Sequence, residues 1–150
     1  MLQGVQWPNS KLTYKVKKYP SPSHIYKRTI SDIDVNDTIR AAMGVWEAVT
    51  NLRFDKIDDG EVDIDISFDK EDHGDEDPFD GPSDMNGDNE LGHAFFPGAS
   101  LRADIHLDDT EHWTIKSYQG INLLYILTHK LGHSLVLRHS AEPRSIIAFL

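Results

Sequence analysis

The sequence predicts an α+β fold with a mixed sheet, and the spacing of its apolar residues carries this prediction. Residues 62–68 alternate between apolar and polar side chains, as a strand with one buried face does. Residues 35–49 and 122–137 instead place apolar side chains at steps of three and four, which is typical of an amphipathic helix. A strand, a helix, several strands and a second helix, in that order, are expected of an α+β domain.

The first half of the chain predicts a strand, a helix and two further strands. A short apolar alternation marks the first strand, and a loop over 19–26 leads from it towards the helix. Ser31 with Asp34 can cap this helix, because a Ser side chain accepts the free N–H groups of a first turn. Residues 52–54 and 62–68 are the two further strands. The apolar positions of the first strand and first helix are Leu12, Tyr14, Val16, Val35, Ile39, Ala42, Trp46 and Val49.

The second half predicts two short strands that each carry a histidine, followed by a helix. The strands lie within 91–96 and 103–107, and the helix runs from about Asn122 to Leu137. We expect leucines to form the buried stripe of this helix and its two histidines to face the other way. The stripe is Leu124, Leu127, Leu131 and Leu135.

Composition predicts one domain over residues 1–150 and excludes two classes of partner. With 150 residues, 39% of them hydrophobic, the chain is long enough to bury a core. A formal net charge of −10 argues against nucleic-acid binding, which needs a basic surface. No apolar run is long enough to span a membrane. The absence of cysteine leaves histidines and carboxylates as the available zinc ligands.

Three histidines near the C-terminus have the spacing of a zinc site. His129 and His133 are four residues apart, so on a helix they project from one face and can bind one ion. A hydrolytic zinc site places a general base, usually Glu, directly after the first histidine. Lys130 occupies that position, and its positive charge is the wrong one for a base.

The third histidine, His139, reaches the first pair only if the helix breaks. On a straight helix it would lie ~15 Å beyond His129, turned away from it. Gly suits such a break because its φ can be positive at little cost, whereas Val136 is β-branched and poorly suited to it. From the helix alone both outcomes stay open.

A second group of candidate ligands lies in the middle of the chain. His73 and Asp75 belong to an acidic loop, and His93 and His106 belong to the two short strands. Three imidazoles and one carboxylate make a closed four-coordinate set, which suits a structural zinc. Nearby carboxylates offer hard oxygen ligands for calcium. They include Asp80, Asp108 and Glu111.

Over nearly its whole length the chain resembles the catalytic domain of the matrix metalloproteinases, in the metzincin group of zinc endopeptidases. The resemblance implies a mixed five-stranded sheet, two long helices and a zinc cleft between subdomains, with the family's C-terminal helix missing after Leu150. The matching stretches include Val45-Trp46, Ile66-Ser67-Phe68, His73-Gly74-Asp75, Pro78-Phe79-Asp80-Gly81-Pro82, His93-Ala94-Phe95, Glu111-His112-Trp113-Thr114 and Leu131-Gly132-His133-Ser134-Leu135.

The resemblance also assigns metal ligands. It implies a catalytic zinc on His129, His133 and His139, and a structural zinc on His73, Asp75, His93 and His106. It implies one calcium on Asp80, Gly81, Ser83, Asp108 and Glu111. It implies a second calcium on Asp63, Ser100, Arg102 and Asp104, where the family prefers Gly at 100 and 102.

The departures from the family cluster at the active site. Lys130 replaces the general-base Glu and Val136 replaces the Gly of the helix break. The residues around Val136 match the family closely, so the resemblance favours a forced break with a strained Val136. Ile147 stands for the Met beneath the zinc, and Ala148 and Phe149 stand for the Tyr and Pro that wall the specificity pocket. These changes predict a cleft whose residues are no longer constrained by a catalytic role.

Two functions follow as expectations. The first is a secreted, extracellular zinc endopeptidase that cleaves extracellular proteins or peptides, with severely impaired activity because of Lys130. The second is a protease-like domain that keeps its fold, zinc and calcium and binds an extracellular protein or peptide without cleaving it. A deliberately inactivated variant is a third interpretation, which Val136 and Ile147 make weaker. The opening Met1-Leu2-Gln3-Gly4 and the lack of a signal peptide lead us to expect a processed or recombinant piece.

Overall fold

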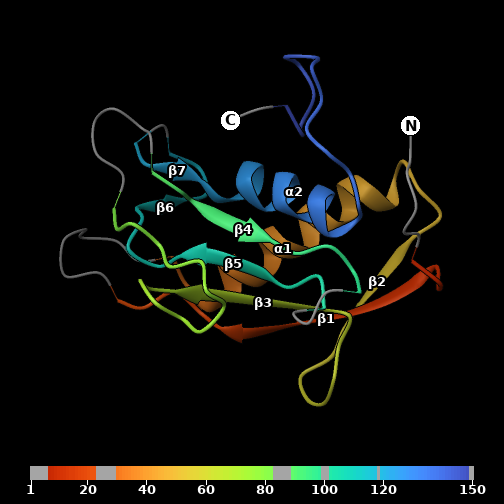
Figure 1. Ribbon diagram of the computed structural model, residues 1–150, viewed down its shortest axis with the longest axis horizontal. Helices are drawn as coiled ribbons and strands as arrows, with labels where there is room; N and C mark the ends of the chain where they lie inside the picture. The colour runs from red at the N-terminus through yellow and green to blue at the C-terminus, as the bar shows by residue number, and fades with distance from the viewer. Residues whose placement is uncertain (1–6, 23–29, 83–88, 99–101, 118, 149–150) are drawn as a thin grey trace.

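A mixed five-stranded sheet forms the framework of the protein. The computed structural model describes residues 7–22, 30–82, 89–98, 102–117 and 119–148. The strand order is β2-β1-β3-β5-β4, with β4 antiparallel to β5 at the edge and the other neighbours parallel (Figure 1). The strands are β1 (Lys11–Lys18), β2 (Arg53–Lys56), β3 (Ile64–Asp69), β4 (Gly92–Ala94) and β5 (Ile105–Asp108). The predicted α+β class and the mixed five-stranded sheet are confirmed.

The first helix, α1 (Asp32–Glu47), begins at the predicted cap. The Ser31 hydroxyl accepts the Asp34 N–H at 3.1 Å and donates to the Asp34 carboxylate at 2.8 Å. Val49 was predicted to belong to the buried face, but this is wrong, because α1 ends at Glu47 and Val49 is 72% exposed. The Val49 N–H turns back to the Trp46 carbonyl, and this turn leads the chain towards β2.

The second helix, α2 (Leu123–Ser134), packs against α1 and β4. Asn122 caps it by accepting the Tyr125 N–H at 3.0 Å. The predicted leucine stripe is wrong at Leu124, which is 37% exposed. Because α2 has neighbours on two sides, its buried face is wider than one stripe and is centred elsewhere. The residues that fill it include Leu123, Ile126, Leu127, Leu131 and Leu135.

The core lies between the sheet and the helices. In Figure 1, α1 runs behind the sheet and α2 lies beside β4. Ile66 and Phe68 of β3 and Leu107 of β5 are fully buried, and each such side chain contributes roughly 1.5–3 kcal/mol of burial free energy. The Trp46 indole N–H of α1 donates to the Thr128 carbonyl of α2 at 3.0 Å, which ties the two helices together.

The rest of the described chain frames the two ends of α2. A small parallel pair, β6 (Trp113–Thr114) with β7 (Ile121–Asn122), precedes the helix. After it, the chain to Ala148 forms a loop closed by a bridge between Ser140 and Ala148, and this described segment contains no further helix. None of the described helices is both long and apolar enough to cross a membrane.

Two candidate metal centres

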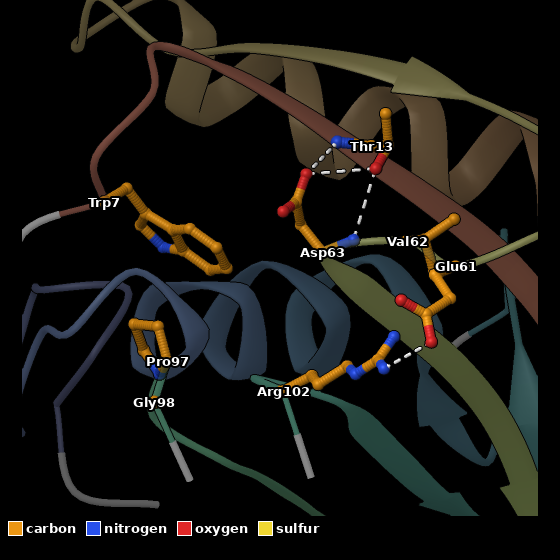
Figure 2. Close-up of a pocket in the computed structure, with 8 residues that line it drawn as sticks. All are labelled: Trp7, Thr13, Glu61, Val62, Asp63, Pro97, Gly98 and Arg102. Atoms are coloured by element: carbon orange, nitrogen blue, oxygen red, sulfur yellow. Dashed lines mark hydrogen bonds and ion pairs between the residues drawn. The ribbon is translucent and has the colours of Figure 1, made fainter. Parts of the chain in front are cut away.

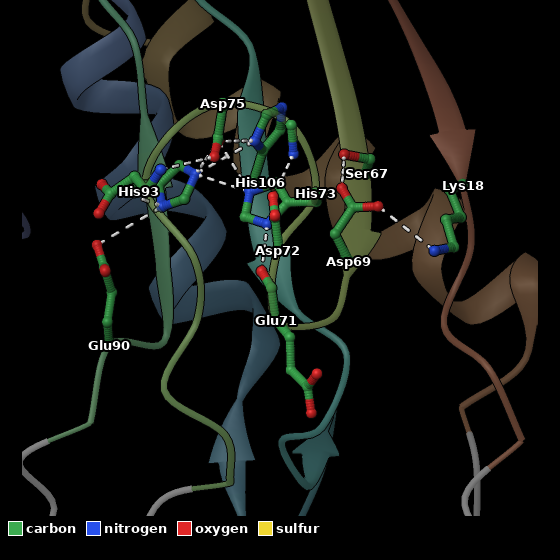
Figure 3. A network of polar contacts seen from close by, with 12 residues as sticks. Lys18, Ser67, Asp69, Glu71, Asp72, His73, Asp75, Glu90, His93 and His106 are labelled. Atoms are coloured by element: carbon green, nitrogen blue, oxygen red, sulfur yellow. Dashed lines mark hydrogen bonds and ion pairs between the residues drawn. The ribbon is translucent and has the colours of Figure 1, made fainter.

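The first candidate centre joins a loop to the sheet edge, and we call it the loop–strand centre: His73, Asp75, His93 and His106. His93 of β4 and His106 of β5 are directly opposed in the antiparallel pair, and the loop after β3 brings the other two residues over them (Figure 3). The Asp75 Oδ2 atom lies 2.6 to 2.8 Å from a ring nitrogen of each histidine.

The spacing in this centre is that of ligands around one ion. The His93 Nε2 atom is 3.2 Å from both His73 Nε2 and His106 Nδ1. Ligands of a tetrahedral ion with bonds of about 2.0 Å are about 3.3 Å apart, so one zinc accounts for four converging nitrogen and oxygen atoms. The residues present therefore fit a closed, four-coordinate zinc.

The protonation states of the loop–strand centre also suit a metal. Burial pushes the pKa of Asp75 up, but hydrogen bonds from the Asp77 N–H and from His106 and His93 outweigh it and bring the pKa to about 2. Burial lowers the pKa of His106. The His73 Nδ1–H donates to the Glu71 carbonyl at 2.8 Å, which leaves the Nε2 lone pair facing inward.

The second candidate centre is carried by α2, and we call it the helix centre: His129, His133 and His139. The His133 Nε2 atom lies 3.0 Å from His129 Nε2 and 3.1 Å from His139 Nε2. The three histidines converge because the helix stops after Ser134 and the chain turns at Val136, whose φ is 71°. The predicted break at Val136, with a left-handed backbone, is confirmed.

Hydrogen bonds at the helix end hold this turn. The Val136 N–H donates to the His133 carbonyl and the Leu137 N–H donates to the Gly132 carbonyl. This pair of bonds is the Schellman arrangement, in which the residue with positive φ is usually Gly. Here a β-branched side chain occupies that position, which costs of order 1–3 kcal/mol.

Backbone carbonyls fix the outer ring nitrogens of His129 and His133 in the helix centre. His129 Nδ1–H donates to the Ile146 carbonyl at 2.9 Å, and His133 Nδ1–H donates to the Leu137 carbonyl at 2.8 Å. Carbonyl oxygens only accept, so both Nε2 atoms present lone pairs to the centre. Burial, together with the charges of neighbouring His and Lys130, lowers the pKa of His129 to about 4 despite the opposing Ile146 bond. At neutral pH the imidazole is therefore neutral, as a ligand must be.

Lys130 is half-buried on α2, directly after the first histidine of the helix centre. Burial lowers the pKa of its ammonium, and the negative charge of Glu90 acts in the opposite direction. The helix centre thus has three converging imidazoles and a lysine at the position where a hydrolytic centre needs a carboxylate.

The structure describes most, but not all, of the residues predicted for the first calcium. Asp108 is fully buried and its Oδ2 atom has no hydrogen-bond partner among the described residues, while Glu111 is also buried. Burial raises the pKa of Asp108, the Thr110 hydrogen bonds lower it, and the charges of Asp80 and Asp109 raise it. A buried carboxylate oxygen without a donor fits a cation ligand. Ser83 lies outside the described residues.

The residues predicted for the second calcium have other partners. Asp63 accepts the Thr13 N–H at 2.8 Å, and Asp104 accepts the Asp65 N–H at 3.2 Å. Asp63 and Arg102 line a pocket of about 380 Å³, where the Arg102 guanidinium pairs with Glu61 at 2.7 Å. Figure 2 shows this pocket and the ion pair. Arg102 therefore supplies a positive charge at a position where the prediction needs only a carbonyl oxygen. Ser100 lies outside the described residues.

Sequence reasoning missed two carboxylates, Asp77 and Glu90, which face the outer nitrogen of His93 at 3.7 and 3.6 Å. Their positions two residues after Asp75 and three before His93 are the only signal in the sequence. That signal is too weak to separate them from the surrounding acidic residues.

Comparisons with known proteins agree with this geometry. The family model described as Matrixin matches residues 6–150. The chain is 44% identical over 145 residues to macrophage metalloelastase of Rattus norvegicus, which covers 97% of this chain and 28% of that protein. It is 43% identical over 142 residues to matrilysin of Homo sapiens, with 94% and 51% covered. It is 43% identical over 136 residues to interstitial collagenase of Bos taurus, with 91% and 26% covered. The chain thus spans about a quarter to a half of these relatives.

Proposed function

The chain belongs to the matrixin family, and from this premise we propose that residues 1–150 form a secreted zinc metallopeptidase domain with little or no peptidase activity. One observation carries the proposal: three imidazoles converge with the spacing of zinc ligands while Lys130 takes the place of the general base. The protein or peptide that it would bind is extracellular, as the family resemblance implies.

The helix centre would hold its zinc through His129, His133 and His139, and the loop–strand centre would hold a structural zinc. A zinc ion in the helix centre would lower the pKa of a coordinated water, which is the chemistry that family hydrolysis uses. The residue beside it must then accept a proton. An ammonium cannot, so the residues of this chain bind and orient but do not supply the base.

The charge of Lys130 also opposes metal binding. An ammonium about 5 Å from a zinc ion is repelled by several kcal/mol even at an effective dielectric near 20. Burial lowers the pKa of Lys130, which favours the neutral amine and relieves the repulsion. A neutral amine accepts a proton or fills an open coordination position, but neither restores the hydrolytic mechanism of the family. Loss of a positioned base typically costs ~10²–10⁴ in rate.

Calcium is the second proposed cofactor. The Oδ2 atom of buried Asp108 has no partner in the described part of the chain, which supports one calcium held with Asp80, Glu111 and the carbonyls of Gly81 and Ser83. A second calcium on Asp63, Asp104 and the carbonyls of residues 100 and 102 has less support, because Arg102 brings a positive charge to that pocket.

The alternative function is a binding domain without any hydrolysis, and Lys130 is the observation that favours it. Such a domain would keep the zinc centres and the family fold, and would hold an extracellular protein or peptide in the cleft. Both candidate functions predict metal binding, so only the rate of peptide cleavage distinguishes them.

The test combines zinc analysis with a sensitive fluorogenic peptide assay on the unaltered chain and on Lys130→Glu. We expect zinc in both proteins, negligible cleavage by the first and a rise of ~10²–10⁴ in the variant. Lys116→Glu makes the same charge change at an exposed site and should not raise the rate. Adding His139→Ala to Lys130→Glu should abolish the gain. Robust, chelator-sensitive cleavage by the unaltered chain would overturn the proposal.

A further inference from the structure

The outer nitrogen of His93 differs from those of three other histidines in the two centres. The outer nitrogens of His73, His129 and His133 each donate to a backbone carbonyl at 2.8 to 2.9 Å. His93 Nδ1 is buried and has no hydrogen-bond partner among the described residues. The side chain of His93 is only 9% exposed, so solvent does not readily replace the missing acceptor.

Two carboxylates face this nitrogen. The Glu90 Oε1 atom lies 3.6 Å and the Asp77 Oδ2 atom 3.7 Å from His93 Nδ1, and Figure 3 shows Glu90 reaching towards the ring from the chain that leads into β4. These distances exceed those of an N–H···O hydrogen bond by about 0.5–0.8 Å. The two carboxylate side chains are 40% and 60% exposed, so both have room to close this gap.

The tautomer of the His93 imidazole decides whether the two carboxylates can accept a hydrogen bond from Nδ1. When Nε2 of His93 offers its lone pair to an ion, Nδ1 must carry the proton and becomes a donor. A buried donor without an acceptor costs about 1–3 kcal/mol, whereas a carboxylate acceptor makes a charge-assisted bond. A zinc ion with Asp75 leaves one net positive charge in the loop–strand centre, which further favours anions beside it.

We propose that Asp77 and Glu90 are positioning residues for the loop–strand centre, where they accept the Nδ1–H of His93 and hold its ring towards the zinc. The inference rests on the proposed zinc at His73, Asp75, His93 and His106. One carboxylate comes from the loop after β3 and the other from the segment before β4.

Glu90 has a second neighbour that gives it a wider role than Asp77. The charges of Glu90 and Lys130 act on each other, and α2 packs directly against β4. The negative charge of Glu90 therefore acts on His93 of the loop–strand centre and on Lys130 beside the helix centre.

The experiment measures zinc affinity by competition with a chromophoric chelator. All proteins carry His139→Ala, which weakens the helix centre so that the titration reports the loop–strand centre. We expect the pair Asp77→Ala with Glu90→Ala to lower zinc affinity by ~10–100-fold, the usual effect of removing carboxylate partners of a ligating histidine. Asp77→Asn with Glu90→Gln should lose less, because an amide oxygen still accepts. Glu76→Gln, an exposed change of the same charge on the same loop, is the control and should have little effect.

Nitrogen-15 NMR of the imidazoles provides a readout that a change in folding would not mimic. In the zinc-loaded protein the Nδ1–H of His93 should give a protected, downfield signal that the double alanine variant loses, while the Nδ1–H of His73 keeps its signal. Equal zinc affinity in all variants, or an unchanged His93 signal, would overturn the inference. If the parent protein binds no zinc at the loop–strand centre, the proposed function itself fails, which is a separate outcome.

Discussion

Val136 is the residue on which the helix centre depends. Its φ of 71° places it where Gly is usual, yet the turn forms and brings His139 within 3.1 Å of His133. The two turn hydrogen bonds, and the bond from the His133 ring to Leu137, therefore outweigh the backbone strain of a β-branched side chain.

At the residue scale we expect Val136→Gly to stabilise the protein and tighten zinc binding at the helix centre. Relief of strain of order 1–3 kcal/mol exceeds the extra entropy of Gly in the unfolded chain, so a net gain of about 1 kcal/mol is expected in chemical denaturation. Arg138→Gly is the matched control: it is exposed, its φ is not positive, and it should destabilise. No gain for Val136→Gly in either stability or zinc affinity would contradict the strain account.

At the element scale, the contact between the two helices passes through Gly132. A Cβ at this position would lie 2.6 Å from the Ile147 Cγ2 atom and 3.0 Å from the Trp46 ring. The absence of a side chain therefore lets α2 lie close to α1 and lets Ile147 pack against α2 at Gly132.

We expect Gly132→Ala to destabilise the protein by about 1–3 kcal/mol, since the core must shift to admit a methyl group. Gly44→Ala on α1 is expected to have the opposite effect and to stabilise the protein. A Cβ at Gly44 meets nothing within 4 Å, so the variant should gain roughly 0.5–1 kcal/mol from helix propensity alone. Thermal unfolding of both variants measures the difference, and a Gly132→Ala protein as stable as the parent would show that the helices pack less closely than described.

At the scale of the whole molecule, metal binding opposes the repulsion of an acidic chain. The formal net charge is −10, and the ligands of the loop–strand centre come from the loop after β3 and from strands β4 and β5. Zinc binding free energy is therefore partly folding free energy for this region.

We expect removal of metal by a chelator to loosen residues 69–107 while the contact between α1 and the sheet persists. Hydrogen exchange should rise in the loop after β3 and in β4, stay low in α1, and return to its first pattern when zinc is added. Restoration by calcium alone would contradict the assignment of zinc to the loop–strand centre. Uniform loss of protection over the whole chain would show that metal and core unfold together.

The sequence by itself determined the order of helices and strands and the types of the candidate ligands. Periodicity placed α1, α2 and β3, because side-chain direction along a helix or strand is a local property. The spacing of His129 and His133 on a helix predicted their convergence for the same reason. Ser31 was identifiable as a cap because its role involves residues only three apart.

Only the tertiary structure decided which faces are buried and how the ligands meet. Leu124 and Val49 continue the apolar period but are exposed, since burial depends on which elements pack alongside. The φ of Val136 reflects the competition of strain with turn hydrogen bonds, which no local preference resolves. Asp77 and Glu90 lie 13 residues apart in the sequence and meet at one nitrogen because β4 pairs with β5 beneath the loop after β3. Such contacts form only when distant segments pack together. The sequence therefore determines which side chains are available, and the fold determines the distances between them.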